Sequence, residues 1–233
     1  MKILVIDVGG SNVKFRATDQ DEPRKFPSGD KLTPQQMVTK IREQTADWDY
    51  EAISLGLPAP FGKNGLRSEP DNLGDGWVGF DFAKALGKPT KVINDAAMQA
   101  LGAYEGGRML FLGLGTGLGS TLIISRIILP LELGRLLYAD ATIVDYLGKE
   151  GLEKHGKERW LRAIHEVVPI LREACVADHV VLGGGEVEQV EELPEGTKRG
   201  GNSDAFEGGF RLWETEVVHT DHAPAPEVWR VVV

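Results

Sequence analysis

Two glycine-rich loops, each enclosed by strand-forming residues, constrain the fold of this chain more than any other feature. The first loop comes after the apolar run Lys2–Asp7 and before the alternating segment Asn12–Thr18. The second comes after Met109–Leu114 and before Thr121–Leu129, which we expect to be a single strand. Apolar, β-branched runs bounded by glycine are typical of strands. Each half of the chain therefore opens with a strand, a glycine turn and another strand.

Helices and strands alternate after each of these openings. Thr33 is a candidate N-cap ahead of Pro34, and we expect a helix over 167–176 despite Pro169 within it. We expect further strands over 52–57, 90–93 and 179–182, and helices over 33–45, 80–86, 96–104, 141–165, 167–176 and 204–216. The repeated opening predicts two α/β lobes with a cleft between them. The boundary falls near 95–107, giving lobes over 1–95 and 96–233, with the final helix a candidate to pack back on the first lobe.

Charge and composition exclude several classes of protein. The 233 residues carry a formal charge of −9, whereas a nucleic-acid-binding protein usually presents a basic face, so we expect no nucleic-acid partner. No run approaches the roughly 20 apolar residues of a membrane span, and the N-terminal apolar stretch is too short for a signal peptide. We therefore expect a cytoplasmic protein without a membrane partner. The single cysteine, Cys175, excludes an internal disulfide and a cysteine-rich zinc site.

The first loop has the chemistry of an anion site beside a strand end. Its candidate phosphate-binding residues are Gly9, Gly10, Ser11, Asn12 and Lys14. Two adjacent glycines let backbone amides face an anion closely. Asp7, at the end of the strand, is placed to hold Mg²⁺ directly or through water, because Mg²⁺ favours one or two carboxylates plus phosphate oxygens. The alternative is an ordinary Gly-Gly hairpin turn with solvated neighbours.

The second loop, Gly113–Ser120, is a phosphate site of a different kind from the familiar nucleotide motifs. A dinucleotide fingerprint fits poorly, because Ser120 occupies the third glycine position and strand-forming residues follow in place of a helix. A Walker loop is excluded, because no Gly-Lys-Ser/Thr ends it. A hairpin that binds phosphate through the amides of Gly115, Thr116 and Gly117 fits better.

These loops, in this order, resemble those of the actin-like sugar kinases, and within them the ROK family. The family's first loop reads Asp-x-Gly-Gly-Thr-x-x-Lys, and here Ser11 replaces the threonine. A third match is an apolar strand followed by Gly183, Gly184 and Gly185, which in the family lie beside the nucleotide. The resemblance extends over most of residues 3–210. It implies an α/β, actin-like (ribonuclease H-like) two-lobe fold with a central cleft, Mg²⁺ as cofactor and phosphotransferase activity toward an alcohol.

Asn94 and Asp95 match the catalytic pair of the family. The resemblance implies that both bind sugar hydroxyls and that Asp95 is the general base. Phosphoryl transfer needs a carboxylate that accepts the proton of the attacking hydroxyl, and one at a strand end beside a cleft can do so. The alternative is that either side chain caps the helix that begins at Ala96.

Residues 132–135 depart from the family pattern. ROK sugar kinases show Glu-x-Gly-His, with Glu and His on the sugar; here Glu132 is retained and Arg135 replaces the histidine. Arginine is longer, always charged and donor-only, so it can hold a hydroxyl, favour an acidic sugar or phosphate, or lie in a surface turn. The resemblance also places Asn72 near the sugar, with Trp77 as a ring face or a packing wall.

The phosphoryl donor stays open between ATP and polyphosphate. The chain lacks the zinc motif of many ROK members and resembles the short, zinc-free polyphosphate glucokinases, also in the strings 129–134 and 201–204. Polyphosphate needs a basic track, and the charge of −9 weighs against one. The candidates for such a track are Lys14, Arg126, Lys198 and Arg199.

We therefore expect a sugar kinase that transfers a phosphoryl group from ATP or polyphosphate to a glucose-like hexose. The alternatives are a non-catalytic regulator that binds sugar or phosphate, and a phosphatase of the same superfamily. ROK repressors carry a DNA-binding segment ahead of the first loop, so a strand that begins at Lys2 predicts no repressor. The resemblance makes a homodimer a candidate state. His219, Asp221 and His222 have the composition of a metal site, but their Pro-rich surroundings favour a solvated segment.

Overall fold

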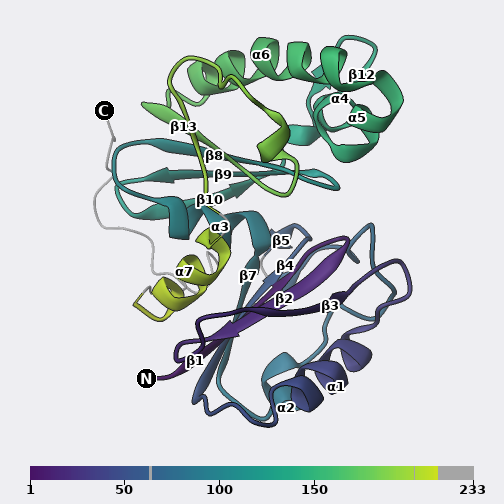
Figure 1. Ribbon diagram of the computed structural model, residues 1–233, viewed down its shortest axis with the longest axis vertical. Coiled ribbons are helices and arrows are strands. Elements are labelled where there is room, and N and C mark those ends of the chain that lie inside the picture. The colour runs from purple at the N-terminus through teal and green to yellow at the C-terminus, as the bar shows by residue number, and fades with distance from the viewer. Residues whose placement is uncertain (63–64, 202, 215–233) are drawn as a thin grey trace.

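Two five-stranded sheets, one in each half of the chain, form the two lobes of the molecule (Figure 1). The computed structural model describes residues 1–62, 65–201 and 203–214, so the candidate metal group at 219–222 lies outside the described residues. No helix within these described ranges has the length and apolar character needed to cross a membrane.

The two sheets have the same topology. In the first, the order is β3-β2-β1-β4-β7; in the second it is β10-β9-β8-β13-β14. In each sheet, neighbours among the first three strands of this order are antiparallel, and the last two strands run parallel to the central strand. The strands are β1 Ile3–Val8, β2 Asn12–Ala17, β3 Arg24–Pro27, β4 Ala52–Leu57, β7 Thr90–Asn94, β8 Met109–Leu114, β9 Leu118–Ile124, β10 Ile127–Leu131, β13 His179–Gly183 and β14 Thr197–Arg199. The repetition seen in the two openings therefore extends through the whole of each sheet.

Helices cover both sheets, and two small hairpins extend from them. The hairpins pair β5 Phe61–Gly62 with β6 Gly65–Leu66, and β11 Leu137–Tyr138 with β12 Ala141–Thr142. The α-helices are α1 Pro34–Gln44, α2 Phe82–Leu86, α3 Asp95–Ala103, α4 Ile143–Leu147, α5 Lys149–His155, α6 Lys157–Ala174 and α7 Asp204–Arg211. Short 3₁₀ turns are η1 Leu133–Arg135, η2 Val187–Gln189 and η3 Leu212–Glu214.

In the first lobe, α1 and α2 cover the outer face of the sheet. The expected N-cap is confirmed, because Thr33 accepts the N–H of Gln36 and Gln36 bonds back in a capping box. The apolar stripe Met37, Val38 and Ile41 is fully buried against the strands. Burial of this stripe fixes the helix on the sheet.

In the second lobe, the helical region is divided differently from the expectation. It forms α4, α5 and α6, with breaks at Gly148 and Gly156, and α6 runs without a break through Pro169. The expected separate helix over 167–176 is therefore wrong. Proline costs a helix one hydrogen bond, and burial of residues such as Trp160 and Leu171 along α6 outweighs that cost.

The expected single strand over 121–129 is also wrong. The chain reverses at Ser125 and Arg126, which have φ values of 50° and 67°, and it returns as β10. Two consecutive residues with positive φ make the tight turn that suits a hairpin. Neither residue is the glycine or asparagine that usually indicates such a turn, so the sequence pattern did not reveal it.

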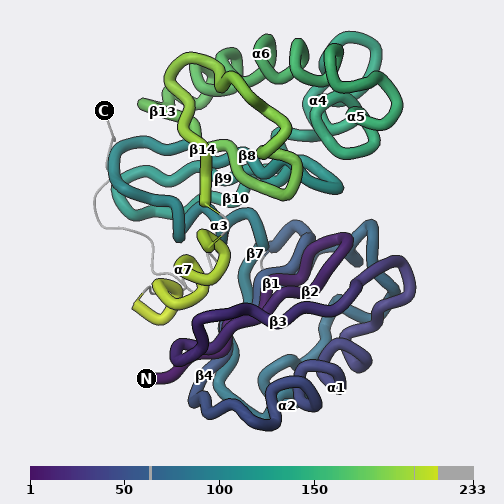
Figure 2. Tube along the Cα trace, in the orientation of Figure 1, coloured from purple at the N-terminus to yellow at the C-terminus, as the bar shows by residue number. Residues whose placement is uncertain are grey.

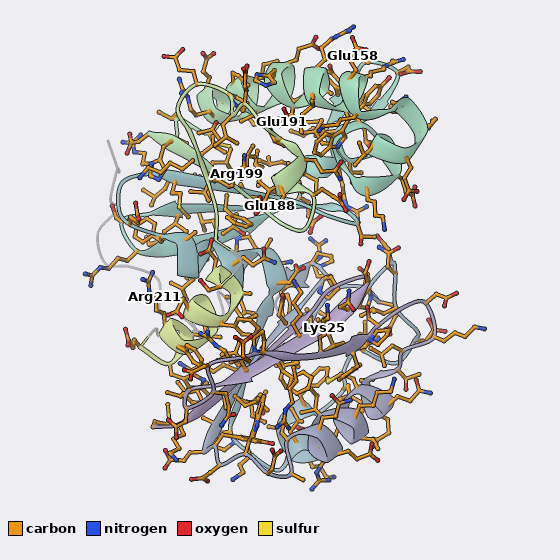
Figure 3. The ribbon with its side chains drawn as sticks, viewed as in Figure 1. Lys25, Glu158, Glu188, Glu191, Arg199 and Arg211 are labelled. Atoms are coloured by element: carbon orange, nitrogen blue, oxygen red, sulfur yellow. The ribbon has the colours of Figure 1, made fainter. Side chains whose placement is uncertain are left out.

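Helices α3 and α7 lie between the two sheets, and α7, from the end of the described chain, packs on β1 (Figures 1 and 2). The two helices touch backbone to backbone, since a Cβ on Gly208 would lie 1.7 Å from the Met98 carbonyl oxygen. Ser54 of β4 donates to the Gly209 carbonyl at 2.5 Å. Arg211, labelled in Figure 3, donates to the carbonyls of Leu101, Gly102 and Tyr104 at the end of α3. These contacts join the lobes behind the cleft.

Candidate functional site

A cavity of about 700 Å³ opens between the lobes, and its walls come from both sheets and from α3. Trp77, Arg126, Lys198 and Arg199 do not line this cavity, but all the other residues proposed for the site do. They are Asp7, Gly9, Gly10, Ser11, Asn12, Lys14, Asn72, Asn94, Asp95, Gly115, Thr116, Gly117, Glu132, Arg135, Gly183, Gly184 and Gly185. The fold thus brings together side chains and amides that lie far apart in the sequence.

The two glycine loops face each other across the cavity. A Cβ on Gly10 would lie 2.9 Å from Oγ1 of Thr116, so only glycine allows this approach without a shift of the threonine. The first turn is closed by the Gly9 N–H, which donates to the Asn12 carbonyl at 2.9 Å. The second loop is held from outside by the N–H of Lys149, which donates to the Gly115 carbonyl at 2.8 Å. An anion between the loops would meet backbone from both lobes.

Asp7 is a buried carboxylate with unused bonding capacity. It stands opposite Lys14 in the β1–β2 register, and only 9% of its surface is exposed. Its Oδ1 atom is buried and has no hydrogen-bond partner among the described residues. Burial raises the pKa of Asp7 to about 6, while the nearby charge of Lys14 acts to lower it. A buried carboxylate oxygen that accepts no hydrogen bond is suited to bind a cation that enters the cavity together with a ligand.

Asp95 begins α3 beside that carboxylate. Gly56, the partner of Asp7 in the neighbouring strand, has no side chain to keep α3 away, and a Cβ there would lie 3.3 Å from the Asp95 Cα. Burial, and then the charges of Asp7 and Glu132, raise the pKa of Asp95 to about 7. Its Oδ1 accepts the Ala96 N–H at 2.8 Å. A carboxyl group that titrates near neutral pH is well tuned for general-base work.

Asn94 does cap the helix, as the alternative interpretation held, and it also lines the cavity. Its Oδ1 accepts the Ala97 N–H at 3.0 Å, and its Nδ2 donates to the Ala59 carbonyl at 3.2 Å. These two bonds fix the side-chain amide at the junction of β7 and α3. Capping and ligand contact are therefore compatible at this position.

The residues around Asp7 fit the magnesium that the family resemblance implies. Within the described part of the chain, no cluster of three or more His, Cys, Asp or Glu side chains could hold a metal ion by itself. Mg²⁺ does not require such a cluster, because it is commonly held by one or two carboxylates plus substrate phosphates and water. The orphaned Oδ1 of Asp7 provides that kind of ligand beside the phosphate loops.

Glu132 and Arg135 lie together at another part of the wall. The Arg135 Nε atom is 3.6 Å from a carboxylate oxygen of Glu132, and both side chains are largely exposed. Ser120 fixes this segment, because its hydroxyl donates to the Leu131 carbonyl at 2.8 Å and accepts the Leu133 N–H at 3.0 Å. Arg135 is therefore a cavity residue whose charge is balanced by its neighbour.

The structure narrows two subsidiary expectations. Trp77 is fully buried and its Nε1 donates to the Leu32 carbonyl at 3.3 Å, so of its two proposed roles only the packing wall is present. Of the four candidates for a basic track, Lys14 alone lines the cavity. Lys198 pairs with Glu105 at 2.9 Å. Arg199, labelled in the upper lobe of Figure 3, donates to the carbonyls of Val187 and Val190.

Several cavity residues escaped the sequence analysis. They include Asp71, Gln99, Lys149, Glu186, Gly200, Gly201 and Phe206. Gln99 could have been found, because it lies one helical turn after Asp95 and shares its face of the helix. No sequence pattern indicated Lys149, because its position beside the second loop depends on the path of the chain after β12.

Comparison with known proteins connects this arrangement to one group of structures. No protein-family model matches the sequence, and no curated protein matches it. The polyphosphate/ATP-glucomannokinase of Arthrobacter sp. strain KM is 20% identical in sequence to this chain, with a TM-score of 0.78. The match covers 89% of this chain and 96% of that protein's chain. The ROK-family glucokinase of Streptomyces griseus, solved with glucose and AMPPNP, is 15% identical with a TM-score of 0.69, over 91% and 99%. The chain has the fold of the ROK sugar kinases.

The ROK fold also occurs in a regulator. A ROK-family transcriptional regulator, a homologue of the E. coli MLC protein, is 12% identical with a TM-score of 0.67, over 91% of this chain and 77% of that one. The expected actin-like, two-lobed α/β fold is confirmed by these similarities and by the paired sheets. Because kinases and a regulator share the ROK fold, the activity has to be argued from the site.

The pKa values of the buried carboxyl groups of Asp7 and Asp95 predict how the stability of the protein depends on pH. We expect the free energy of unfolding of the ligand-free protein to fall by roughly 4 kcal/mol as pH rises from about 5 to about 8. The folded-state pKa values of Asp7 and Asp95, about 6 and about 7, lie above the unfolded values, so the folded chain binds more protons in this interval. Stability is therefore lost as pH rises through the folded pKa values. Urea unfolding at a series of pH values measures this loss, and a stability that rises across the interval would contradict it.

Proposed function

We propose that this protein is a ROK-family sugar kinase that transfers a phosphoryl group from ATP or polyphosphate to a hydroxyl of a neutral hexose. The observation that carries the proposal is the position of Asp95, a carboxyl with a pKa of about 7 in a cavity that also contains both glycine loops. Phosphoryl transfer depends on positioning, charge neutralisation and a proton acceptor, and the cavity provides residues for each.

In the proposed reaction, Asp95 accepts the proton of the sugar hydroxyl. The hydroxyl oxygen then forms a bond to the terminal phosphorus of the donor, and the bond from that phosphorus to the bridging oxygen breaks, with the electron pair leaving on the shortened donor. The amides of both loops and Lys14 hold the donor phosphates. Asp7 would hold Mg²⁺, whose charge would neutralise phosphate oxygens beside the loops.

The acceptor end of the cavity favours a neutral sugar. Asn72, Asn94 and Glu132 offer amides and a carboxylate to hydroxyl groups. The positive charge of Arg135 is balanced by Glu132, and Asp71 adds a further acid to the wall. An anionic acceptor would therefore meet net repulsion, so Arg135 is proposed to donate hydrogen bonds to hydroxyls.

A panel of hexoses assayed separately with ATP and with polyphosphate, with the sugar phosphate detected directly, tests this function. Formation of a hexose phosphate supports the kinase and identifies the donor. Product with acidic sugars alone would contradict the neutral acceptor. Release of inorganic phosphate without any sugar phosphate would favour a phosphatase.

A second candidate is a regulator that binds sugar or phosphate without catalysis. The fold shared with a ROK regulator and the ion pair of Arg135 with Glu132 favour it. Calorimetric titration with the same hexoses separates the two candidates. Measurable sugar binding without product from any donor would support the regulator and reject the kinase.

A further inference from the structure

The two phosphate loops differ in charge. The first loop ends in Lys14, whereas the second, Gly113–Ser120, consists of glycine, leucine, threonine and serine. The loops approach each other closely at Gly10 and Thr116. A phosphate chain held between them therefore meets a cation from the first loop, and any cation on the opposite side has to come from a neighbouring element.

Lys149 is the residue that supplies a cation next to the second loop. It is the first residue of α5, its N–H donates to the Gly115 carbonyl at 2.8 Å, and it lines the cavity. Gly148, just before it, also packs on the loop, since a Cβ there would lie 3.3 Å from the Thr116 carbonyl oxygen. Two backbone contacts thus fix the start of α5 against the loop.

The ammonium group of Lys149 is only weakly engaged. Its nearest acidic partner is Glu153, at 4.0 Å, in a pair whose side chains are 47% and 67% exposed. Exposed pairs at this spacing contribute little, and a lysine ammonium on its flexible stem can leave such a pair for a stronger one. Among the described cavity-lining residues the other cations are Lys14 on the first loop and Arg135, which is paired with Glu132.

We propose that Lys149 binds the phosphates of the donor from the side of the second loop, opposite Lys14. This role rests on the kinase function proposed above and adds a donor-binding residue to it. A chain of phosphates, whether in a nucleoside triphosphate or in polyphosphate, carries several negative charges between the two loops. A lysine ammonium is a compact point charge that suits such a chain, and a hydrogen bond to a charged group is stronger than a neutral one.

The test is direct donor binding by the full chain. Calorimetric titrations with Mg-ATP and with tripolyphosphate are made on the wild type, Lys149→Gln, Lys149→Arg and a matched control, Lys154→Gln. Lys154 lies on the same helix, interacts with Asp140 and Asp145, and is not among the residues that line the cavity. We expect Lys149→Gln to weaken donor binding roughly tenfold or more, with sugar affinity unchanged. Lys149→Arg should retain most of the affinity, and Lys154→Gln should match the wild type.

The outcomes separate this proposal from the function on which it rests. Wild-type donor affinity in Lys149→Gln, or equal losses in Lys149→Gln and Lys154→Gln, would overturn the role of Lys149 and leave the kinase function standing. A wild-type protein that binds neither donor would overturn both. If the loss appears with Mg-ATP but not with tripolyphosphate, Lys149 contacts the nucleoside part, and its assignment to the phosphates is wrong.

Discussion

Replacement of Asp95 by asparagine is expected to lower turnover by roughly a thousandfold while sugar affinity stays close to that of the wild type. Asparagine keeps the oxygen that accepts the Ala96 N–H, so the start of α3 is preserved. It cannot accept the proton of the attacking hydroxyl. Turnover measured with saturating sugar and donor, together with calorimetric sugar binding, gives the two quantities.

The same substitution is expected to stabilise the ligand-free protein at alkaline pH. Wild-type Asp95 has to ionise in a buried position, and beside Asp7 and Glu132, as pH rises through its pKa of about 7, and asparagine removes that cost. The gain should therefore be present near pH 8 and small near pH 5. A variant that is inactive yet more stable would show that the carboxylate is retained for chemistry.

Asp81→Asn is the matched control for both measurements. Asp81 is the N-cap of α2, where its Oδ1 accepts the Lys84 N–H at 3.0 Å, and it is not among the residues that line the cavity. This variant should keep full turnover and show no gain in stability at alkaline pH. Substantial turnover in Asp95→Asn, with Asp81→Asn normal, would assign the base to another residue.

Gly208→Ala is expected to destabilise the protein by roughly 3 kcal/mol or more. The added Cβ would lie 1.7 Å from the Met98 carbonyl oxygen and 2.8 Å from the Gly102 nitrogen. Both are backbone atoms of α3, so no rotamer change can relieve the contact, and the two helices have to separate. Because Asp95 begins α3, we also expect activity to fall.

Urea unfolding compares this variant with Glu207→Ala at the neighbouring position of α7. Glu207 is half-exposed and pairs with Arg16 at 2.9 Å, so its loss should cost no more than about 1 kcal/mol. Equal stability of Gly208→Ala and the wild type would mean that α7 does not pack on α3 in solution as it does here.

The fold was predictable from the sequence where the local residue pattern and the packing of the folded chain favour the same structure. β4 has the expected bounds, and the cap of α1 at Thr33 was foreseen, because apolar runs and capping residues act over a few positions. The errors at β10 and α6 have the opposite origin. A turn at Ser125 and Arg126 lacks the usual turn residues, and α6 joins two segments that the sequence pattern separated near residue 166. Packing against the second sheet determines both.

Many residues that line the cavity were proposed from the sequence, while their interactions were not. Loop composition and the order of the motifs identified Asp7 and Asp95, but only the packing of α3 beside Gly56 shows that their charges interact. Lys149 was missed for the same reason, since a lysine in a charged helical region gives no indication of what its backbone contacts. The division into lobes at residues 95 and 96 and the roles of the individual site residues stay predictions.

The position of α7 on β1 has a consequence for how the chain folds during synthesis. Ile3, Val5 and Ser54 leave the ribosome long before the helix that packs on them, which begins at Asp204. Until that helix emerges, the part of the inner face that α7 covers is exposed to water and to other chains, although Met98 of α3 also packs there. The long separation along the sequence should make closure of this face a late and slow step. We therefore expect a nascent chain that stops before α7 to depend on chaperones for solubility, although its first sheet is already complete.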